Sequence, residues 1–420
     1  MKPGWKRMRG RRAGMAFILI TLFLDVLGIG IVIPVLPGLV TSFLGGDASA
    51  AAPWYALLAG GYAAMQFVFA PLLGALSDRF GRRPVILASL AGFGVSYLAL
   101  AAAPTLAWLF VARLAAGVAG ATLTAGNAYV ADVSDERTRA RNYGLVGVAF
   151  GLGFVAGPAL GGVLGEIGLR VPFLVSAGIV GLNFVYGLLV LPESLPEERR
   201  TTFSWRRADP LRSLVALREF PLAAGLAASL TLLMLGQRGM ESVFVLYTDW
   251  RYGWGPGQNG VALALVGVMA VIVQGGLIRP VVARWGERRT ATVGMTILAC
   301  GLVAYGLADR GAWLLIAIVV GGLGALAQPA LQSLVAGSVP PERQGAVQGA
   351  ITSLLSASAV LAPLVAGGLF GAFTGDGAPL QLPGAPFFAA AAFVLVGLIL
   401  ALRTFRRLPA NAASRRESLE

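Results

Sequence analysis

The sequence predicts an all-α membrane protein with twelve transmembrane helices in two pseudo-symmetric six-helix bundles. Three observations lead to this fold class. The 420-residue chain is 57% hydrophobic and only 13% charged, whereas soluble domains carry roughly 25% charged residues. Long apolar segments alternate with polar loops, and every second loop is rich in Lys and Arg. Landmark residues of the first half recur in the second half at one constant offset.

Twelve apolar segments are long enough to cross a bilayer, which takes about 20 helical residues. They occupy residues 15–37, 54–76, 85–103, 106–130, 143–165, 171–191, 221–248, 258–282, 290–308, 313–336, 346–372 and 386–403. The first segment is too long for the apolar core of a signal peptide and lacks a small-residue cleavage site, so we expect it to be a span. The 57 glycines and 23 prolines are tolerated because neighbouring helices satisfy the freed backbone groups.

The chain divides at its longest polar interval, residues 192–220, which we expect to be a cytoplasmic linker. It would join an N-terminal bundle over 1–191 to a C-terminal bundle over 221–404, and residues 405–420 would form a cytoplasmic tail. An internal repeat supports this division. A shift of 205 residues brings together the pairs Gly81–Gly286, Trp108–Trp313, Gly117–Gly322, Pro158–Pro363 and Gly162–Gly367. An ordered series at one offset indicates duplication.

The distribution of positive charge orients the chain. Most of the 33 Lys and Arg residues lie before the first span, in the loops that follow even-numbered spans, and after the last span. The opposite loops hold only Arg170, Arg251 and Arg310. Cytoplasmic loops carry an excess of Lys and Arg. Both termini are therefore expected in the cytoplasm, and the protein is expected in the inner (cytoplasmic) membrane. The net charge of +13 therefore indicates orientation rather than a nucleic-acid partner.

The chain contains one cysteine, Cys300, and no histidine. An internal disulfide and a multi-thiolate metal site are excluded, and no metal or cofactor is expected. Without histidine there is no Ser-His triad and no histidine-containing zinc site, which argues against an intramembrane enzyme. Proton transfer near neutral pH must then fall to carboxylates. A transport-dead sensor would need a soluble signalling domain, and the residues after Thr404 are too few for one.

Asp25 lies within the first span, on the helical face that also carries Thr21 and Gly28. An ionised carboxylate that faces lipid costs several kcal/mol, so Asp25 should face a wet cavity, find a partner or be protonated. Burial favours the protonated form, which suits proton or substrate coupling. The alternative is a hydrogen-bonded anchor against a neighbouring helix.

Three further charges lie inside predicted spans. Arg113 is alone in the fourth span and keeps its charge in any environment, so it needs a carboxylate or carbonyl partner, for which Asp25 is our candidate. Its alternative role is to cap backbone carbonyls. Arg238 and Glu241 in the seventh span are three residues apart and can touch on one helical face. The pair can act as a proton-sensitive switch or as a fixed brace.

A charged turn, residues 74–84, separates the second and third spans and reads Gly-Ala-Leu-Ser-Asp-Arg-Phe-Gly-Arg-Arg-Pro. It resembles the signature loop of the major facilitator superfamily of secondary transporters. The resemblance implies the major facilitator fold and a gating role for Gly74, Asp78, Arg79, Gly81, Arg82 and Arg83, with Asp78 set against a helix N-terminus. The second copy keeps Gly286 but lacks the aspartate. The alternative is a turn that only orients the protein.

Two further motifs resemble those of the same superfamily. The fifth span contains Gly153, Gly157, Pro158, Gly161 and Gly162, which resemble the motif associated with antiporters and favour export over import. Glycine and proline bend a helix and allow close packing, so a kink without functional meaning is the alternative. The stretch around Arg113 resembles the fourth-helix motif, whose arginine is associated with proton coupling.

Polar side chains within the spans are candidates to line a substrate cavity. They are Tyr62, Gln66, Asn127, Gln237, Gln274, Gln328 and Gln332. Each can instead make a hydrogen bond between packed helices. A cytoplasmic cluster follows the fourth span and consists of Asp132, Asp135, Glu136, Arg137, Arg139 and Arg141. It can latch the charged turn by salt bridges or simply be solvated.

Within the superfamily, the chain resembles the tetracycline-exporter branch of the drug:proton antiporters. The resemblance rests on residues 25–37, 76–84, 150–158 and 245–254. Ser96 and Leu298 stand where that branch carries aspartates, and Ala270 stands near its eighth-span histidine. Arg238 and Glu241 are additions. The coupling residues are thus partly rearranged, and the substrate is open between a tetracycline-like compound and another amphipathic drug.

The sequence therefore predicts a monomeric carrier in the lipid bilayer. It would exchange inward protons for an outward amphipathic, drug-like small molecule by alternating access. The alternative is the same fold moving a sugar, a lipid or another metabolite as a symporter or facilitator.

Overall fold

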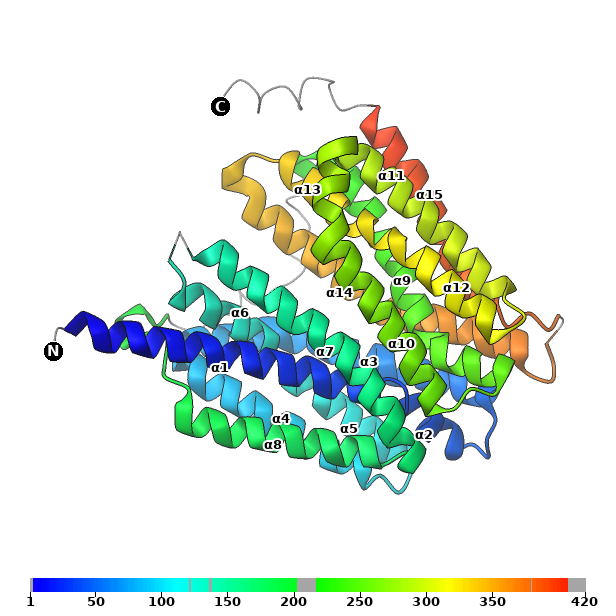
Figure 1. The fold of residues 1–420 in the computed structure, drawn as a ribbon, viewed down its shortest axis with the longest axis horizontal. Helices are drawn as coiled ribbons and strands as arrows, with labels where there is room; N and C mark the ends of the chain where they lie inside the picture. The colour runs from blue at the N-terminus through cyan, green and yellow to red at the C-terminus, as the bar shows by residue number, and fades with distance from the viewer. Residues whose placement is uncertain (1–2, 121, 136–137, 202–216, 379, 407–420) are drawn as a thin grey trace. The chain divides into compact units, whose positions relative to one another are not determined.

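The computed structural model describes residues 3–120, 122–135, 138–201, 217–378 and 380–406, and it is almost entirely helical there (Figure 1). Residues 136–137, most of the predicted linker and the end of the predicted tail lie outside this part. The main helices are α1 Pro3–Val32, α2 Leu36–Ser42, α3 Ala48–Phe80, α4 Arg82–Ala101, α5 Leu106–Ala119, α6 Thr122–Val133, α7 Arg139–Ile167, α8 Val171–Val190, α9 Pro221–Tyr252, α10 Pro256–Val271, α11 Ile278–Leu307, α12 Gly311–Gly322, α13 Ala327–Gly337, α14 Gln344–Thr374 and α15 Ala385–Phe405. Short elements are the 3-10 turns Glu197–Arg199, Leu323–Leu326 and Pro341–Arg343 and the π-helix η4, Ile272–Leu277.

The predicted spans all fall in helical segments. Ten helical stretches of the described chain are long and apolar enough to cross a membrane, and one of them, Pro256–Leu307, contains both the eighth and the ninth predicted span. The seventh predicted span lies in α9, which is 32 residues long and whose hydropathy is lowered by Gln237, Arg238 and Glu241. The twelve-helix fold class is confirmed.

Contacts divide the chain into two compact units. Unit 1 comprises Met1–Asp209, Phe244–Val268 and Thr374–Ala378, and unit 2 comprises Pro210–Val243, Met269–Phe373 and Pro379–Glu420. The residues of α9 and α10 are thus shared between the units. The predicted bundle boundary at 192–220 remains a prediction.

Helix α1 is central to unit 1. It packs against α6, α7 and α8, while α4 packs against α5 and α8, and α3 packs against α5 (Figure 1). Phe17, Leu22 and Ile31 of α1 are completely buried. Because α1 is covered on several sides, a polar side chain on it faces protein rather than lipid.

In unit 2, helix α11 packs against α12, α13 and α15. Among its neighbours, α9 is hydrogen-bonded to α15 and α14. The Ser229 hydroxyl donates to the Gly397 carbonyl of α15 at 2.7 Å, and the Ser358 hydroxyl of α14 donates to the Thr231 carbonyl at 3.4 Å. Such bonds and small residues hold transmembrane helices together where lipid removes the hydrophobic drive between them.

Helix ends follow local sequence signals. Asp47 caps α3 by accepting from the backbone N–H groups of Ser49 and Ala50 at 2.8 and 3.1 Å, as expected of an N-cap aspartate. Gly81 ends α3 with a φ of 105°, a conformation that favours glycine. Pro34, which cannot donate a helical hydrogen bond, separates α1 from α2.

The structure repeats the landmarks that the sequence duplicates. Gly286 has a φ of 74° inside α11, as Gly81 has a positive φ at the equivalent turn. A Cβ on Gly117 would lie 2.7 Å from the Met65 side chain, and one on Gly322 would lie 2.8 Å from the Met269 side chain. The same close helix contact therefore occurs once in each unit.

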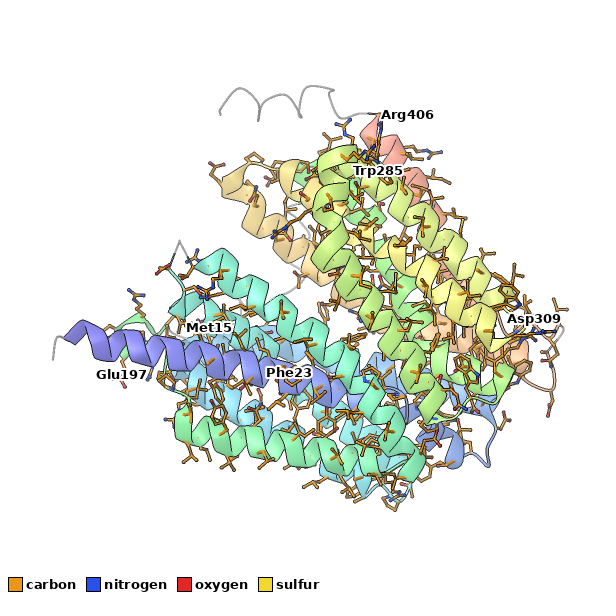
Figure 2. The ribbon with its side chains drawn as sticks, in the orientation of Figure 1. Met15, Phe23, Glu197, Trp285, Asp309 and Arg406 are labelled. Carbon is orange, nitrogen blue, oxygen red and sulfur yellow. The ribbon has the colours of Figure 1, made fainter. Side chains whose placement is uncertain are left out.

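The two ends of each unit match the predicted alternation of loops. In unit 1 the Tyr129 hydroxyl donates to the Pro192 carbonyl at 3.1 Å, which joins the end of the predicted fourth span to the start of the predicted cytoplasmic linker. At the other end, Arg170 donates to the carbonyls of Ala101 and Ala103 at 3.0 and 2.7 Å. In unit 2, Trp285 and Arg406 lie at one end and Asp309 lies at the other (Figure 2).

Candidate functional site

Arg82 is the hub of the charged turn. Its Nη1 atom lies 2.6 Å from the Asp78 carboxylate and donates to the Ser77 hydroxyl at 2.6 Å, and its Nε donates to the Asp132 carboxylate at 3.1 Å. Only 8% of Arg82 is exposed. A buried guanidinium needs partners on several sides, and here they come from the turn itself and from the end of α6. The turn is thereby tied to the first residue of the predicted cytoplasmic cluster.

The other residues of the charged turn have separate contacts. The Gly74 carbonyl accepts from the Ser77 hydroxyl at 2.8 Å, and the Arg79 guanidinium lies 5.0 Å from the centre of the Phe80 ring. Arg83 donates to the Leu188 carbonyl at 2.8 Å. Asp78, which we expected against a helix N-terminus, forms its ion pair with Arg82.

The carboxylate at the N-terminus of α4 is that of Glu193, which we had placed only within the linker. It accepts from the backbone N–H groups of Arg82 and Arg83 at 2.9 and 3.2 Å, and from those of Ser194 and Leu195 at 2.9 and 3.0 Å. A Cβ on Gly81 would collide with this carboxylate. Glu193 lies just after the sixth predicted span in Pro192-Glu193-Ser194, and nothing local in the sequence pairs it with α4.

The other described residues of the cytoplasmic cluster have separate surroundings. Asp135 and Thr138 hydrogen-bond to each other, with the Thr138 hydroxyl donating to the Asp135 carboxylate at 2.7 Å. Arg139 and Arg141 are exposed. Glu136 and Arg137 lie outside the described residues. Of this cluster, Asp132 is the residue that the structure brings to the charged turn.

The predicted coupling residues Asp25 and Arg113 gather around two tyrosines of unit 1. Asp25 is only 5% exposed. The Arg113 guanidinium lies over the Tyr62 ring, 4.0 Å from its centre. The Tyr97 hydroxyl of α4 lies 3.5 Å from a Cβ built on Gly28, one turn after Asp25 on α1. The structure thus brings α1, α3, α4 and α5 together at one polar centre inside an otherwise apolar bundle.

Neighbouring polar groups extend this centre. Gln66, one turn after Tyr62, donates to the Tyr62 hydroxyl at 2.9 Å. Thr21, one turn before Asp25, donates to the Oδ1 atom of Asn183 at 3.2 Å, and both side chains are buried. Thr21 of the predicted polar face is therefore hydrogen-bonded to α8, with Asn183 as a partner that we had not identified.

The predicted antiporter motif divides between two faces of α7. Gly153, Gly157 and Gly161 face α1, where a Cβ on Gly157 would lie 2.7 Å from the Cα of Gly30. Gly162 faces α10, because a Cβ there would lie 2.9 Å from the Cα of Gly260. The Pro158 carbonyl lies on this second face, 2.6 Å from a Cβ built on Gly260. The motif lets three helix backbones approach closely.

In unit 2 the predicted pair of α9 is formed. Arg238 Nη1 lies 2.9 Å from Glu241 Oε2, and the side chains are 55% and 32% exposed. Gln237 Nε2 donates to Glu241 Oε1 at 3.3 Å. Both oxygens of the carboxylate therefore have partners on α9 itself, and protonation of Glu241 would weaken both contacts.

The other predicted cavity residues are distributed over both units. Asn127 is exposed on α6, and its backbone carbonyl accepts from the Tyr143 hydroxyl at 3.2 Å. Gln274 is exposed within the π-helix η4, whereas Gln328 and Gln332 are half-buried on α13. The sequence did not predict η4. Single π-helical turns of this kind often occur at functional sites.

At the positions that differ from the tetracycline-exporter pattern, the side chains make local hydrogen bonds or packing contacts. The Ser96 hydroxyl donates to the Gly92 carbonyl of its own helix at 2.7 Å. Leu298 packs against Gly324, where an added Cβ would lie 2.7 Å from the Leu298 Cβ. Within the described part of the chain, no three acidic or cysteine side chains come together as metal ligands.

Comparisons with known proteins agree with the helical architecture and the charged turn. The sequence model of the Major Facilitator Superfamily matches residues 18–309 and 252–419. The chain is 38% identical to the class C tetracycline resistance protein of Escherichia coli over 84% of this chain and 89% of that protein. It is 37% identical to the class G tetracycline resistance protein of Vibrio anguillarum, over 87% of this chain and 92% of that protein.

A solved structure has the same fold. The human organic anion transporter MFSD10 (TETRAN) superposes with a TM-score of 0.68 at 25% identity, covering 96% of this chain and 100% of that one. The family match, the two bacterial relatives and this superposition extend over nearly the whole sequence. The chain therefore belongs to the major facilitator superfamily of membrane transporters.

Proposed function

We propose that this protein is a proton-coupled antiporter that exports an amphipathic, drug-like small molecule by alternating access. The observation that carries the proposal is the polar centre of unit 1, where Asp25 is buried and the Arg113 guanidinium lies over the Tyr62 ring. The bacterial relatives are tetracycline resistance proteins, which supports export of a drug.

The coupling step follows from the different chemistry of the two charges. Arg113 stays positive throughout the cycle, whereas Asp25 can be charged or neutral. Binding a proton removes the negative charge and leaves the arginine uncompensated inside the bundle, which is costly. A conformation that rehydrates this centre is then favoured. Glu241 offers a second proton site, because its neutralisation would loosen Arg238 in unit 2.

The remaining motifs are assigned supporting roles. The charged turn would control closure on the cytoplasmic side, with Arg82 as its hub. The motif of α7 would let α1 and α10 pack closely in one state and separate in another. Substrate contacts are assigned to the ring of Tyr62 and to the polar residues Gln66, Asn127, Gln237, Gln274, Gln328 and Gln332. We further propose a single chain as the working unit, in the inner membrane, with both termini in the cytoplasm.

The test measures efflux of tetracycline and of a fluorescent cationic dye from cells. It compares wild type, Asp25→Asn and Glu241→Gln at matched expression, with and without a protonophore. The proposal predicts that efflux requires the proton gradient and that Asp25→Asn abolishes it. If neither compound is exported and both variants resemble wild type, the assignment to drug export is wrong.

A second candidate substrate is an organic anion. The Nε atom of Arg113 is buried and has no hydrogen-bond partner among the described residues, so this guanidinium has capacity for an incoming acidic group. The human organic anion transporter at 25% identity favours the same possibility. Competition of the dye efflux by a membrane-permeant organic acid would distinguish an anion site from a cation site.

A further inference from the structure

A carboxylate at the end of α7 reaches the start of α10. Glu166 Oε1 accepts from the backbone N–H of Gly257 at 2.7 Å, across 91 residues of sequence. Gly257 is the second residue of α10, so this N–H group has no acceptor within its own helix. Both residues belong to unit 1. Glu166 was not among the residues that the sequence singled out.

The Glu166–Gly257 contact lies at one end of a long seam, the interface between α7 and α10. A Cβ on Gly267 would lie 3.1 Å from the Phe154 carbonyl, one on Gly162 would lie 2.9 Å from Gly260, and one on Gly165 would lie 2.6 Å from Pro256. The residue numbers rise along α7 as they fall along α10, so the helices run antiparallel. Glu166 and Gly257 close this seam at the end that the charge distribution assigns to the outside.

Local caps do not account for this carboxylate. The Gly255 N–H donates to the Gln258 side chain at 3.1 Å, and the Asn259 amide donates to the Trp254 and Gly255 carbonyls. The turn before α10 is thus held by its own residues, whereas the charged group comes from α7. A carboxylate is stabilised at a helix N-terminus by the helix dipole and the open N–H groups.

We propose that Glu166 is an outer latch, a positioning residue that holds the start of α10 against the end of α7 and favours the outward-closed state. The inference rests on the proposed alternating access, in which α7 belongs to the first predicted bundle and α10 to the second. Opening the outer side must then break the Glu166–Gly257 hydrogen bond. Glu166 is exposed, so the contact is weak enough to break in every cycle.

The test measures how often the outer end opens. Cys300 is replaced by Ser, and Val35→Cys is introduced as a reporter for a membrane-impermeant maleimide applied to intact cells. Val35 is completely buried and lies beside Pro256, because a Cβ on Gly165 would be 2.5 Å from Val35 and 2.6 Å from Pro256. The reporter therefore reacts only when α10 moves away from this end.

We expect Glu166→Ala to raise the labelling rate about fivefold, because this is the size of effect that one charge at a helix terminus has on an equilibrium. Glu166→Gln should give a smaller increase, because its amide oxygen still accepts the hydrogen bond but the charge is gone. Asp309→Asn is the matched control, since it removes an exposed outer carboxylate that makes no hydrogen bond in the described structure. This control should label at the wild-type rate.

Equal labelling of Glu166→Ala and wild type would overturn the latch, and so would an equal increase in Asp309→Asn. Thermal melting of each purified variant shows that it is folded, and Glu166→Gln keeps the side-chain volume if the alanine variant is unstable. The assay uses no drug and no proton gradient. Its outcome is therefore separate from the outcome of the efflux test.

Discussion

At the scale of single residues, the polar centre of unit 1 depends on how a permanent positive charge is held inside an apolar bundle. Arg113 rests on the face of Tyr62, where the ring quadrupole attracts a cation. Gln66 fixes the same ring through the Tyr62 hydroxyl. Tyr62 therefore positions Arg113 in addition to lining the proposed substrate path.

This arrangement predicts different outcomes for two substitutions of Tyr62. Tyr62→Phe keeps the ring and loses only the hydrogen bond from Gln66, so efflux should fall about twofold. Tyr62→Leu removes a cation–π contact of about 2 kcal/mol in a desolvated site, so efflux should fall at least tenfold. Efflux rates at equal expression measure the difference. Equal loss in both variants would contradict a role for the aromatic ring.

Glu193 predicts an effect on stability. Glu193→Ala leaves the N-terminus of α4 without its carboxylate and should lower the free energy of unfolding by about 1 kcal/mol. Thermal melting in detergent measures this change. The control is Glu197→Gln, because the Glu197 side chain is 84% exposed and its pair with Arg200 is 3.6 Å long, which contributes little. Similar melting of both variants would contradict the cap.

Residues such as Asp25, Arg113 and Glu241 could be found from sequence because a charge within an apolar span is itself a signal. Arg238 and Glu241 could also be paired, because three residues along a helix bring side chains together. Glu193, Asn183 and Glu166 could not be found in this way. Their partners are 91 to 162 residues distant in sequence, and only the packing of helices makes them neighbours.

At the scale of secondary-structure elements, α7 makes close backbone contacts on two of its faces. Its glycines press against α1 on one face and against α10 on the other. A side chain on either face must push a backbone away, and overpacking of this kind costs about 1–3 kcal/mol. The two faces should nevertheless respond differently, because α1 lies in the same predicted bundle as α7 and α10 does not.

Gly157→Ala should therefore reduce folding stability, since its added Cβ meets the α1 backbone at 2.7 Å. Gly162→Ala, whose Cβ meets the Pro256 carbonyl at 2.8 Å, should reduce efflux more than stability. Gly147→Ala is the control on the same helix, with nothing within 4 Å of its added Cβ. Melting and efflux of the three variants test this. The distinction between faces is wrong if Gly157→Ala and Gly162→Ala behave alike.

Composition and span length predicted the positions of the helices well, because lipid forces the backbone into long hydrogen-bonded helices. Composition and span length did not predict irregularities within the helices. The π-helix η4 lies inside the eighth predicted span, and hydropathy carries no information about such a local change of helical hydrogen bonding. The turn between the eighth and ninth predicted spans was predicted, and Gly286 makes it with a positive φ.

At the scale of the whole molecule, duplication explains why each unit repeats the same contacts. Gly117 and Gly322 make equivalent close approaches, and Gly81 and Gly286 make equivalent turns. The charged residues of the turn are not fully duplicated. The first charged turn has Asp78 and Arg82 in an ion pair, whereas the second has Ala283 at the position of the aspartate. Gating by charge is therefore assigned to the first copy.

Sidedness gives a prediction for the complete chain in cells. In a Cys300→Ser background, an impermeant maleimide should label Asp309→Cys in intact cells, because this loop is predicted to be outside. Glu342→Cys, in a predicted cytoplasmic loop, should be labelled only after permeabilisation. Both positions are exposed. The opposite pattern would reverse the orientation, and labelling of both in intact cells would contradict the span assignment.

The most direct test of proton coupling uses purified protein in liposomes that contain a pH-sensitive dye. An outward substrate gradient should drive protons in the opposite direction through the wild-type protein, and Asp25→Asn, inserted at the same density, should carry no substrate-dependent proton flux. Proton flux in Asp25→Asn equal to that of wild type would contradict coupling through this carboxylate. Substrate movement in the wild type without any proton flux would contradict antiport itself.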